Sequence, residues 1–236
     1  MMTTVEKFQD FSYDMDSVDD RIASSFGIRF KAKPRIIVGP IRLFDDGGYL
    51  AYTNTILLNP IAPVDEDVIL HESAHAIQYQ YNVRLYGWYL STIKRSDYFG
   101  VLKKLEKDRL RGLEQRKRLK RRGKTVQEAD KILRQYSLHP DEIFKEMVDF
   151  EIAVNTDAIQ KLANRAENDS ISRYSDGFAE WFRKKLSPTK SVFPYTQTEY
   201  DLFCEMERKV GRKKTLETAF NIINCEELLK ALAEIS

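Results

Sequence analysis

The chain has 236 residues, of which 42% are hydrophobic, 31% charged and 11% aromatic, a composition typical of an ordinary globular protein. Its two cysteines, Cys204 and Cys225, are too few for a disulfide framework, and we expect them to be buried structural thiols of a cytoplasmic protein. Acidic residues near the start argue against a signal peptide, and no apolar run approaches the length of about 18 residues that would predict a membrane-spanning helix.

Charge is distributed unevenly along the chain. The formal net charge is only +2, but Lys103–Lys124 holds twelve Lys or Arg residues against three acids, a local balance of +9 that leaves −7 for the rest. Such a segment could neutralise several phosphates of a nucleic acid, or it could be an ordinary solvated helix. No aromatic residue lies between Val101 and Gln135, so any nucleic-acid contact would involve the backbone and not base stacking.

The N-terminal third predicts a small sheet followed by a helix. Ile36–Val38 is a β-branched run bounded by breakers, and Tyr49–Leu58 follows the turn signal of Asp45–Gly48, so we expect a strand in each. The acids Asp65–Asp67 suit the first turn of a helix, which the pattern extends to about Tyr81.

The rest of the chain predicts mostly helix. A basic helix is expected over Leu102–Arg122, and Ser175 is the predicted N-cap of a helix over Asp176–Leu186 that Ser-Pro then ends. The fold class is therefore α+β. We expect one domain over 1–236, with a mostly helical C-terminal part and a basic helical insertion at about 100–138.

Residues 71–75 form a motif that carries chemistry: His-Glu-Ser-Ala-His, on the predicted helix. His71 and His75 are four residues apart, so both imidazoles point the same way and can chelate one zinc ion. Glu72 is turned by about 100° from His71, where it can take a proton from a metal-bound water. The plainer alternative is a pair of surface histidines without metal. We expect one Zn²⁺ per chain.

Zinc needs at least a third protein ligand, which the motif does not supply. One large class with this motif, the metzincins, is excluded because Gln78 and Tyr81 stand where that class has Gly and His. The remaining histidine, His139, is a possible ligand, although an exposed loop histidine before a proline is the simpler interpretation.

Asp176 and Glu180 are better candidates for the acidic part of the site. They are four apart on one helix face, so one could bind the metal while the other hydrogen-bonds a ligating imidazole. Alternatively, Asp176 simply favours the positive N-terminus of a helix and Glu180 pairs with Lys184 on the surface.

On these residues the sequence resembles the zincin metallopeptidases, in particular the gluzincins, whose third ligand is acidic. The run Asp176–Phe182 is similar to a Glu-x-x-Ala-Glu signature of lethal-factor-like toxin peptidases and phage-encoded peptidase domains. The resemblance covers Arg35–Asn82 and about 173–193. It implies a zincin-like fold in which Asp176 binds zinc and Glu180 orients a histidine. Asp stands where the family usually has Glu, so Glu180 remains open as the direct ligand.

The resemblance also implies a substrate and a reaction. An extended protein or peptide substrate would lie along the sheet edge above the metal, for which Tyr49–Leu58 is the candidate. Tyr174 and His139 are candidates for stabilising the oxyanion. We therefore expect a zinc-dependent endopeptidase with Glu72 as its catalytic base. The alternative is a catalytically inactive zincin-fold protein that binds a protein or nucleic acid through its basic segment. A third possibility, a peptidase acting on nucleic-acid-bound proteins, would use both features.

Overall fold

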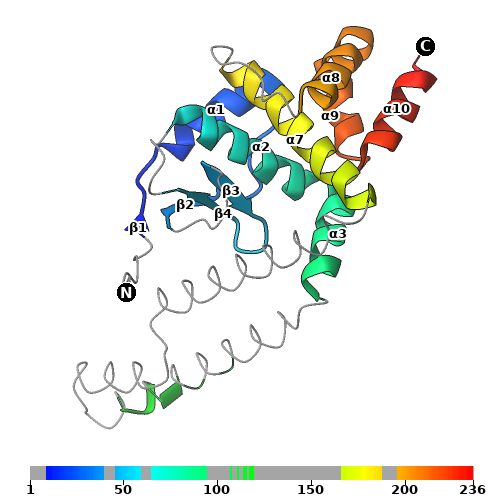
Figure 1. Ribbon diagram of the computed structural model, residues 1–236. Helices are drawn as coiled ribbons and strands as arrows, with labels where there is room; N and C mark the ends of the chain where they lie inside the picture. The colour runs from blue at the N-terminus through cyan, green and yellow to red at the C-terminus, as the bar shows by residue number, and fades with distance from the viewer. Residues whose placement is uncertain are drawn as a thin grey trace, which may run out of the picture. The chain divides into compact units, whose positions relative to one another are not determined.

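The structure is a computed structural model (Figure 1). It describes residues 9–39, 46–59, 65–94, 166–187 and 196–235, with residues 107, 111, 114, 115 and 117–119 between them. The chain divides into two compact units, one formed by Met1–Leu90 with Ile159–Ser236 and the other by Ser91–Ala158. The second unit contains the predicted basic insertion, whose boundaries stay a prediction.

The first unit is a mixed α+β structure, which confirms the predicted class. Its strands are β1 (Gln9–Asp10), β2 (Arg35–Val38), β3 (Gly47–Leu50) and β4 (Thr55–Leu58). The described helices are α1 (Met15–Phe26), α2 (Glu66–Tyr81), α3 (Val83–Lys94), α7 (Ala166–Leu186), α8 (Gln197–Val210), α9 (Arg212–Ala219) and α10 (Cys225–Glu234), of which α3 crosses the boundary between the units.

The four strands form one mixed sheet in the order β1-β2-β4-β3. β2 and β4 are parallel, with Ile36 opposite Ile56, whereas β1 and β3 run antiparallel to their neighbours. The single strand predicted over Tyr49–Leu58 is wrong, because this segment is the end of β3, a four-residue turn and β4. The hairpin makes β3 an edge of the sheet.

The turn of this hairpin is fixed to the rest of the unit by Asn54. Its backbone has φ 49°, the left-handed region that asparagine tolerates better than most residues. The side-chain amide donates to the carbonyls of Ala32 and Lys33 at 3.1 Å each. Its Oδ1 accepts from the hydroxyl of Tyr49 and from Nε2 of Gln80, near the end of α2. Asn54 therefore fixes the position of the edge hairpin relative to the end of α2.

Helix α2 lies between the sheet and the other helices of the unit (Figure 1). Asp65 caps it by accepting from the backbone N–H of Asp67, and the helix ends at Tyr81, as the sequence predicts. Ile69 packs into an apolar cluster with residues of β2 and β4, whereas Leu70 belongs to the larger cluster of the helices. Because α2 packs against an apolar cluster on each of these faces, the helix that carries its polar side chains is fixed in position.

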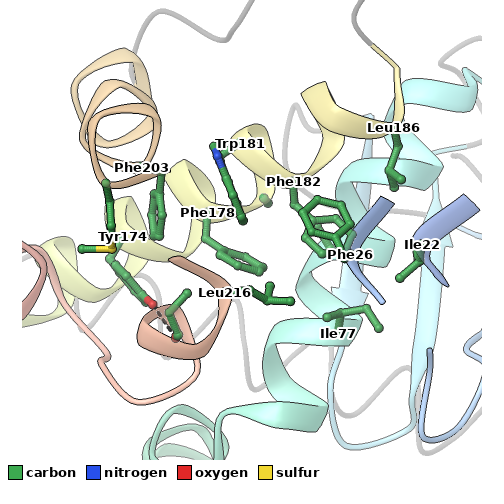
Figure 2. Packing of buried hydrophobic residues seen from close by; sticks show 14 of the residues in the cluster. Ile22, Phe26, Ile77, Tyr174, Phe178, Trp181, Phe182, Leu186, Phe203 and Leu216 are labelled. Atoms are coloured by element: carbon green, nitrogen blue, oxygen red, sulfur yellow. Dashed lines mark hydrogen bonds between the residues drawn. The ribbon is translucent and has the colours of Figure 1, made fainter. Parts of the chain in front are cut away.

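The larger cluster is built around the aromatic residues of α7 (Figure 2). Phe182 stacks on Phe26 of α1 with ring centroids 3.9 Å apart, and Trp181 stacks on Phe203 of α8 at 5.7 Å. Phe178 contacts the rings of both Trp181 and Phe182. These α7 residues form the buried face of the helix, and the opposite, polar face of α7 packs against α2.

The start of α7 differs from the prediction. The helix begins at Ala166 and ends at Leu186, so Ser175 is an interior residue and not an N-cap. The predicted end before Ser187-Pro188 is confirmed. The Ser175 hydroxyl hydrogen-bonds to side chains of α2, which explains a serine inside a helix without a capping role.

Both cysteines are thiols without a disulfide, but they are half-buried, so the prediction of buried thiols is wrong. Cys225 lies at the start of α10 with its Sγ 3.3 Å from the carbonyl oxygen of Ser170. Within the described residues, none of the helices combines the length and the apolar character needed to cross a membrane.

Only part of the basic segment Lys103–Lys124 is described. Residues 107, 111, 114, 115 and 117–119 are helical, and all of them except Leu119 are exposed. Arg118 and Glu114 form an i,i+4 ion pair at 3.8 Å, of the kind expected for a solvated helix. The other residues of the segment lie outside the described part of the chain.

Candidate metal centre

Helices α2 and α7 pack directly against each other and bring three candidate ligands together. His71 and His75 lie one turn apart on α2, with their Nε2 atoms 3.2 Å from each other. Asp176 of α7 places its Oδ1 3.5 Å from Nε2 of His75. One ligand atom from each of the three side chains lies within 4.8 Å of the other two.

The other nitrogen of His71 is held by a buried carboxylate. Glu180 has no exposed surface, and its Oε1 lies 2.8 Å from Nδ1 of His71. Arg183 reaches the same carboxylate through Nε at 3.3 Å and Nη2 at 2.9 Å. Burial alone would raise the pKa of Glu180, but the bonds from His71 and Arg183 outweigh it and lower the pKa to about 2. Glu180 is therefore an ionised acceptor, and Nδ1 of His71 carries the proton.

The other nitrogen of His75 is held by a hydroxyl. Ser175 donates to Oε1 of the buried Gln78 at 2.6 Å, and its oxygen lies 3.1 Å from Nδ1 of His75. Because the serine proton is used toward Gln78, the serine oxygen accepts the proton of His75. In its neutral form, His75 therefore has the same tautomer as His71, and both Nε2 atoms then carry lone pairs.

At 3.2 Å, the two Nε2 atoms can either share a proton or bind one cation together. Zinc bonds of about 2.0–2.2 Å in tetrahedral geometry separate neighbouring ligand atoms by roughly 3.3–3.6 Å. The distance of 3.5 Å from His75 to Asp176 lies within this range, and the distance of 3.2 Å between the histidines lies just below it. Burial lowers the pKa of His75, but the carboxylates of Asp176 and Glu72 outweigh that effect and raise it. The field at the site therefore favours a positive charge.

Glu72 lies between α2 and the edge of the sheet. It is 7% exposed, and a Cβ added to Gly47 of β3 would lie 3.5 Å from Cγ of Glu72. The same Cβ would lie 2.6 Å from Cγ1 of Val68, so only glycine permits this approach without a shift. The edge strand β3 therefore passes beside the side chain of Glu72.

Tyr174 is not brought to the metal centre. Its side chain is buried in the aromatic cluster, where burial raises the pKa of the phenol, and its hydroxyl donates to the carbonyl of Ala219 at 2.7 Å (Figure 2). A role for Tyr174 in stabilising an oxyanion is therefore not supported. The other candidate for that role and for the third ligand, His139, lies outside the described residues.

The plainer interpretations of the two acids do not hold. Asp176 is in the middle of α7, far along the helix from the N-terminal turn that would favour a carboxylate. Glu180 contacts His71 and Arg183, instead of forming the surface pair with Lys184 that its spacing also allows.

The sequence does not predict that Gln78 and Arg183 belong to the site. It predicts Ser175 only as an N-cap and not as a partner of His75. Arg183 follows Glu180 by three residues, so helical i,i+3 spacing could have pointed to that pair. Ser175 and Gln78 give no such signal, because 97 residues separate them and only the packing of α7 on α2 joins them.

Comparisons of the chain with protein-family models, with curated proteins and with solved structures give no match. Membership of the zincins therefore stays a prediction from the sequence.

Proposed function

We propose that the chain is a zinc-dependent endopeptidase in which His71, His75 and Asp176 hold the metal. The convergence of two Nε2 lone pairs and one carboxylate oxygen, at 3.2 and 3.5 Å, carries this proposal. Asp176 is favoured over Glu180 as the third ligand, since the carboxylate of Glu180 is already engaged by His71 and Arg183. Glu180 and Ser175 then act from outside the ligand set, by fixing the tautomers of the two histidines.

The residues around the ligands suit peptide hydrolysis. A bound zinc ion would polarise the scissile carbonyl and lower the pKa of water from about 15.7 to about 7. Glu72 would accept the proton of the attacking water and pass it to the leaving amine. The edge strand β3, which passes beside Glu72, offers backbone groups that can pair with an extended peptide. A peptide is therefore the substrate that this arrangement fits best.

The first prediction concerns Glu72→Gln, with His75→Ala as its comparison. We expect about one zinc ion per chain in the wild type and in Glu72→Gln, and none in His75→Ala. Cleavage of an unbiased peptide library should fall by about 10²–10⁴-fold in Glu72→Gln, because only the proton-transferring group is lost. Elemental analysis of the purified proteins and mass spectrometry of the digests measure these two quantities separately.

Two results would contradict the proposal. A wild-type chain that holds zinc but cleaves no peptide would favour a binding protein that keeps the metal for structure. Cleavage at the wild-type rate by Glu72→Gln would remove Glu72 from the reaction.

A further inference from the structure

Arg183 is a buried cation that connects two carboxylates from different helices. It is 2% exposed. Its Nε and Nη2 contact the two oxygens of Glu180, and its Nη1 lies 3.2 Å from Oδ2 of Asp67. Asp67 is in the first turn of α2, whereas Glu180 and Arg183 are on α7. The guanidinium therefore ties the start of α2 to the polar face of α7.

Stability alone gives little reason to bury these three charges. The desolvation of a buried ion pair usually cancels most of its attraction, and apolar residues of similar volume often serve the fold equally well. A guanidinium can, unlike an apolar side chain, orient a carboxylate, because its planar fork contacts both carboxylate oxygens at once. Here that orientation directs Oε1 of Glu180 at Nδ1 of His71.

We propose that Arg183 is a positioning residue of the metal centre: it fixes the carboxylate of Glu180, so that His71 keeps its proton on Nδ1 and directs Nε2 toward His75. The use of Nε2 as a zinc ligand rests on the proposed function. The orientation and tautomer of His71, in contrast, are properties of the protein without metal.

The connection runs in one direction through three contacts, from Asp67 to Arg183, from Arg183 to Glu180 and from Glu180 to His71. Without the guanidinium, the carboxylate of Glu180 would lose the groups that hold both its oxygens. It could then rotate away from His71, and the neutral imidazole would populate both tautomers. A tautomer with the proton on Nε2 cannot bind a metal through that nitrogen.

The variants Arg183→Gln and Arg183→Lys test this role, with Arg84→Gln as a matched control. Arg84 also makes a two-nitrogen contact with a glutamate, Glu227, but on the surface of α3 and α10. Nitrogen-15 NMR of the metal-free protein reports the tautomer of His71, and competition with a chelating dye reports zinc affinity. We expect a single Nδ1–H tautomer in the wild type and Arg84→Gln, and a mixture in Arg183→Gln. Zinc affinity should fall about 10–100-fold in Arg183→Gln and by less in Arg183→Lys, which keeps the charge but loses the fork.

A double variant separates positioning from a general effect on folding. If Arg183 acts only through Glu180, then Glu180→Gln with Arg183→Gln should bind zinc about as tightly as Glu180→Gln alone. The proposal would be overturned if the losses of zinc affinity in the two single variants multiplied in the double variant. It would also be overturned if His71 kept its wild-type tautomer in Arg183→Gln. If Arg183→Gln does not fold, the same two measurements on Arg183→Lys decide it. Zinc binding without peptide cleavage by the wild type would overturn the proposed function alone, because neither readout involves cleavage.

Discussion

At the scale of single residues, Asp176 and Glu180 share a face of α7 but have different surroundings. The side chain of Asp176 is 28% exposed, whereas that of Glu180 is fully buried. Both oxygens of Glu180 are engaged by neighbours, which leaves Asp176 as the acid that can turn toward a metal. The shorter arm of aspartate is sufficient because α7 packs closely on α2, which brings Oδ1 within 3.5 Å of His75.

The substitution Asp176→Asn tests this assignment. It replaces an anionic ligand by a neutral amide, so zinc affinity should fall by more than the 10–100-fold that is typical of outer partners. The loss of zinc affinity in Glu180→Gln should lie within that range. Asp201 is an exposed residue of α8, and Asp201→Asn should bind zinc like the wild type. Zinc titration of the three variants measures the order. A larger loss in Glu180→Gln than in Asp176→Asn would make Glu180 the direct ligand.

At the scale of elements, the sequence predicts those features that are decided locally. Asp65 caps α2 through its own neighbours, and Ser-Pro ends α7, so both boundaries could be predicted. The start of α7 could not, because Ser175 has the signature of a cap but bonds across the interface to α2. The hairpin of β3 and β4 was missed for a similar reason. Its turn is held by Asn54 through residues about twenty positions away on either side.

Gly177 sets the distance between α7 and α8. A Cβ at this position would lie 2.3 Å from Cβ of Glu199 and 3.1–3.2 Å from its backbone, so Gly177→Ala must push the helices apart. Overpacking of this kind costs about 1–3 kcal/mol of unfolding free energy and exceeds the gain of up to about 1 kcal/mol in helix propensity. Zinc affinity should also fall, since Asp176 is the preceding residue.

Gly87→Ala is the matched control for this prediction. Gly87 is an exposed glycine of α3, and none of the described residues lies within 4 Å of the Cβ that alanine would add. Here the gain in helix propensity acts alone and should raise the unfolding free energy by about 0.5–1 kcal/mol. Urea denaturation measures both variants. Stabilisation by Gly177→Ala would show that the two helices are not in close contact at this point.

At the scale of the whole unit, Glu207 of α8 joins three helices. Its carboxylate accepts from Nε1 of Trp181 at 2.9 Å, and it pairs with Lys185 of α7 at 2.6 Å and with Arg212 of α9 at 3.0 Å. Trp181, which makes one of these contacts, belongs to the aromatic cluster (Figure 2). Helix α7, which carries Asp176 and Glu180, is therefore held to α8 and α9 by contacts other than those of these two acids.

The contacts of Glu207 predict an acid-dependent loss of stability. Burial raises its pKa, but Lys185, Trp181 and Arg212 outweigh burial and lower it below the ordinary value. A pKa lower in the folded than in the unfolded chain stabilises the fold above the unfolded value of about 4.3, and this stability is lost as pH falls through the folded value. Glu207→Gln should therefore lower the unfolding free energy by about 1–2 kcal/mol at neutral pH, and the difference from the wild type should shrink below about pH 4.

Urea denaturation of chelator-treated protein at several pH values measures this difference without a contribution from metal. Glu205→Gln is the control on the same helix, because Glu205 is 44% exposed and makes a single 3.4 Å ion pair with Lys209. An exposed pair contributes little, so this variant should differ from the wild type by less than about 0.5 kcal/mol at any pH. A deficit in Glu207→Gln that stays undiminished as the pH is lowered well below about 4 would mean that shape, and not the charge of Glu207, holds the three helices together.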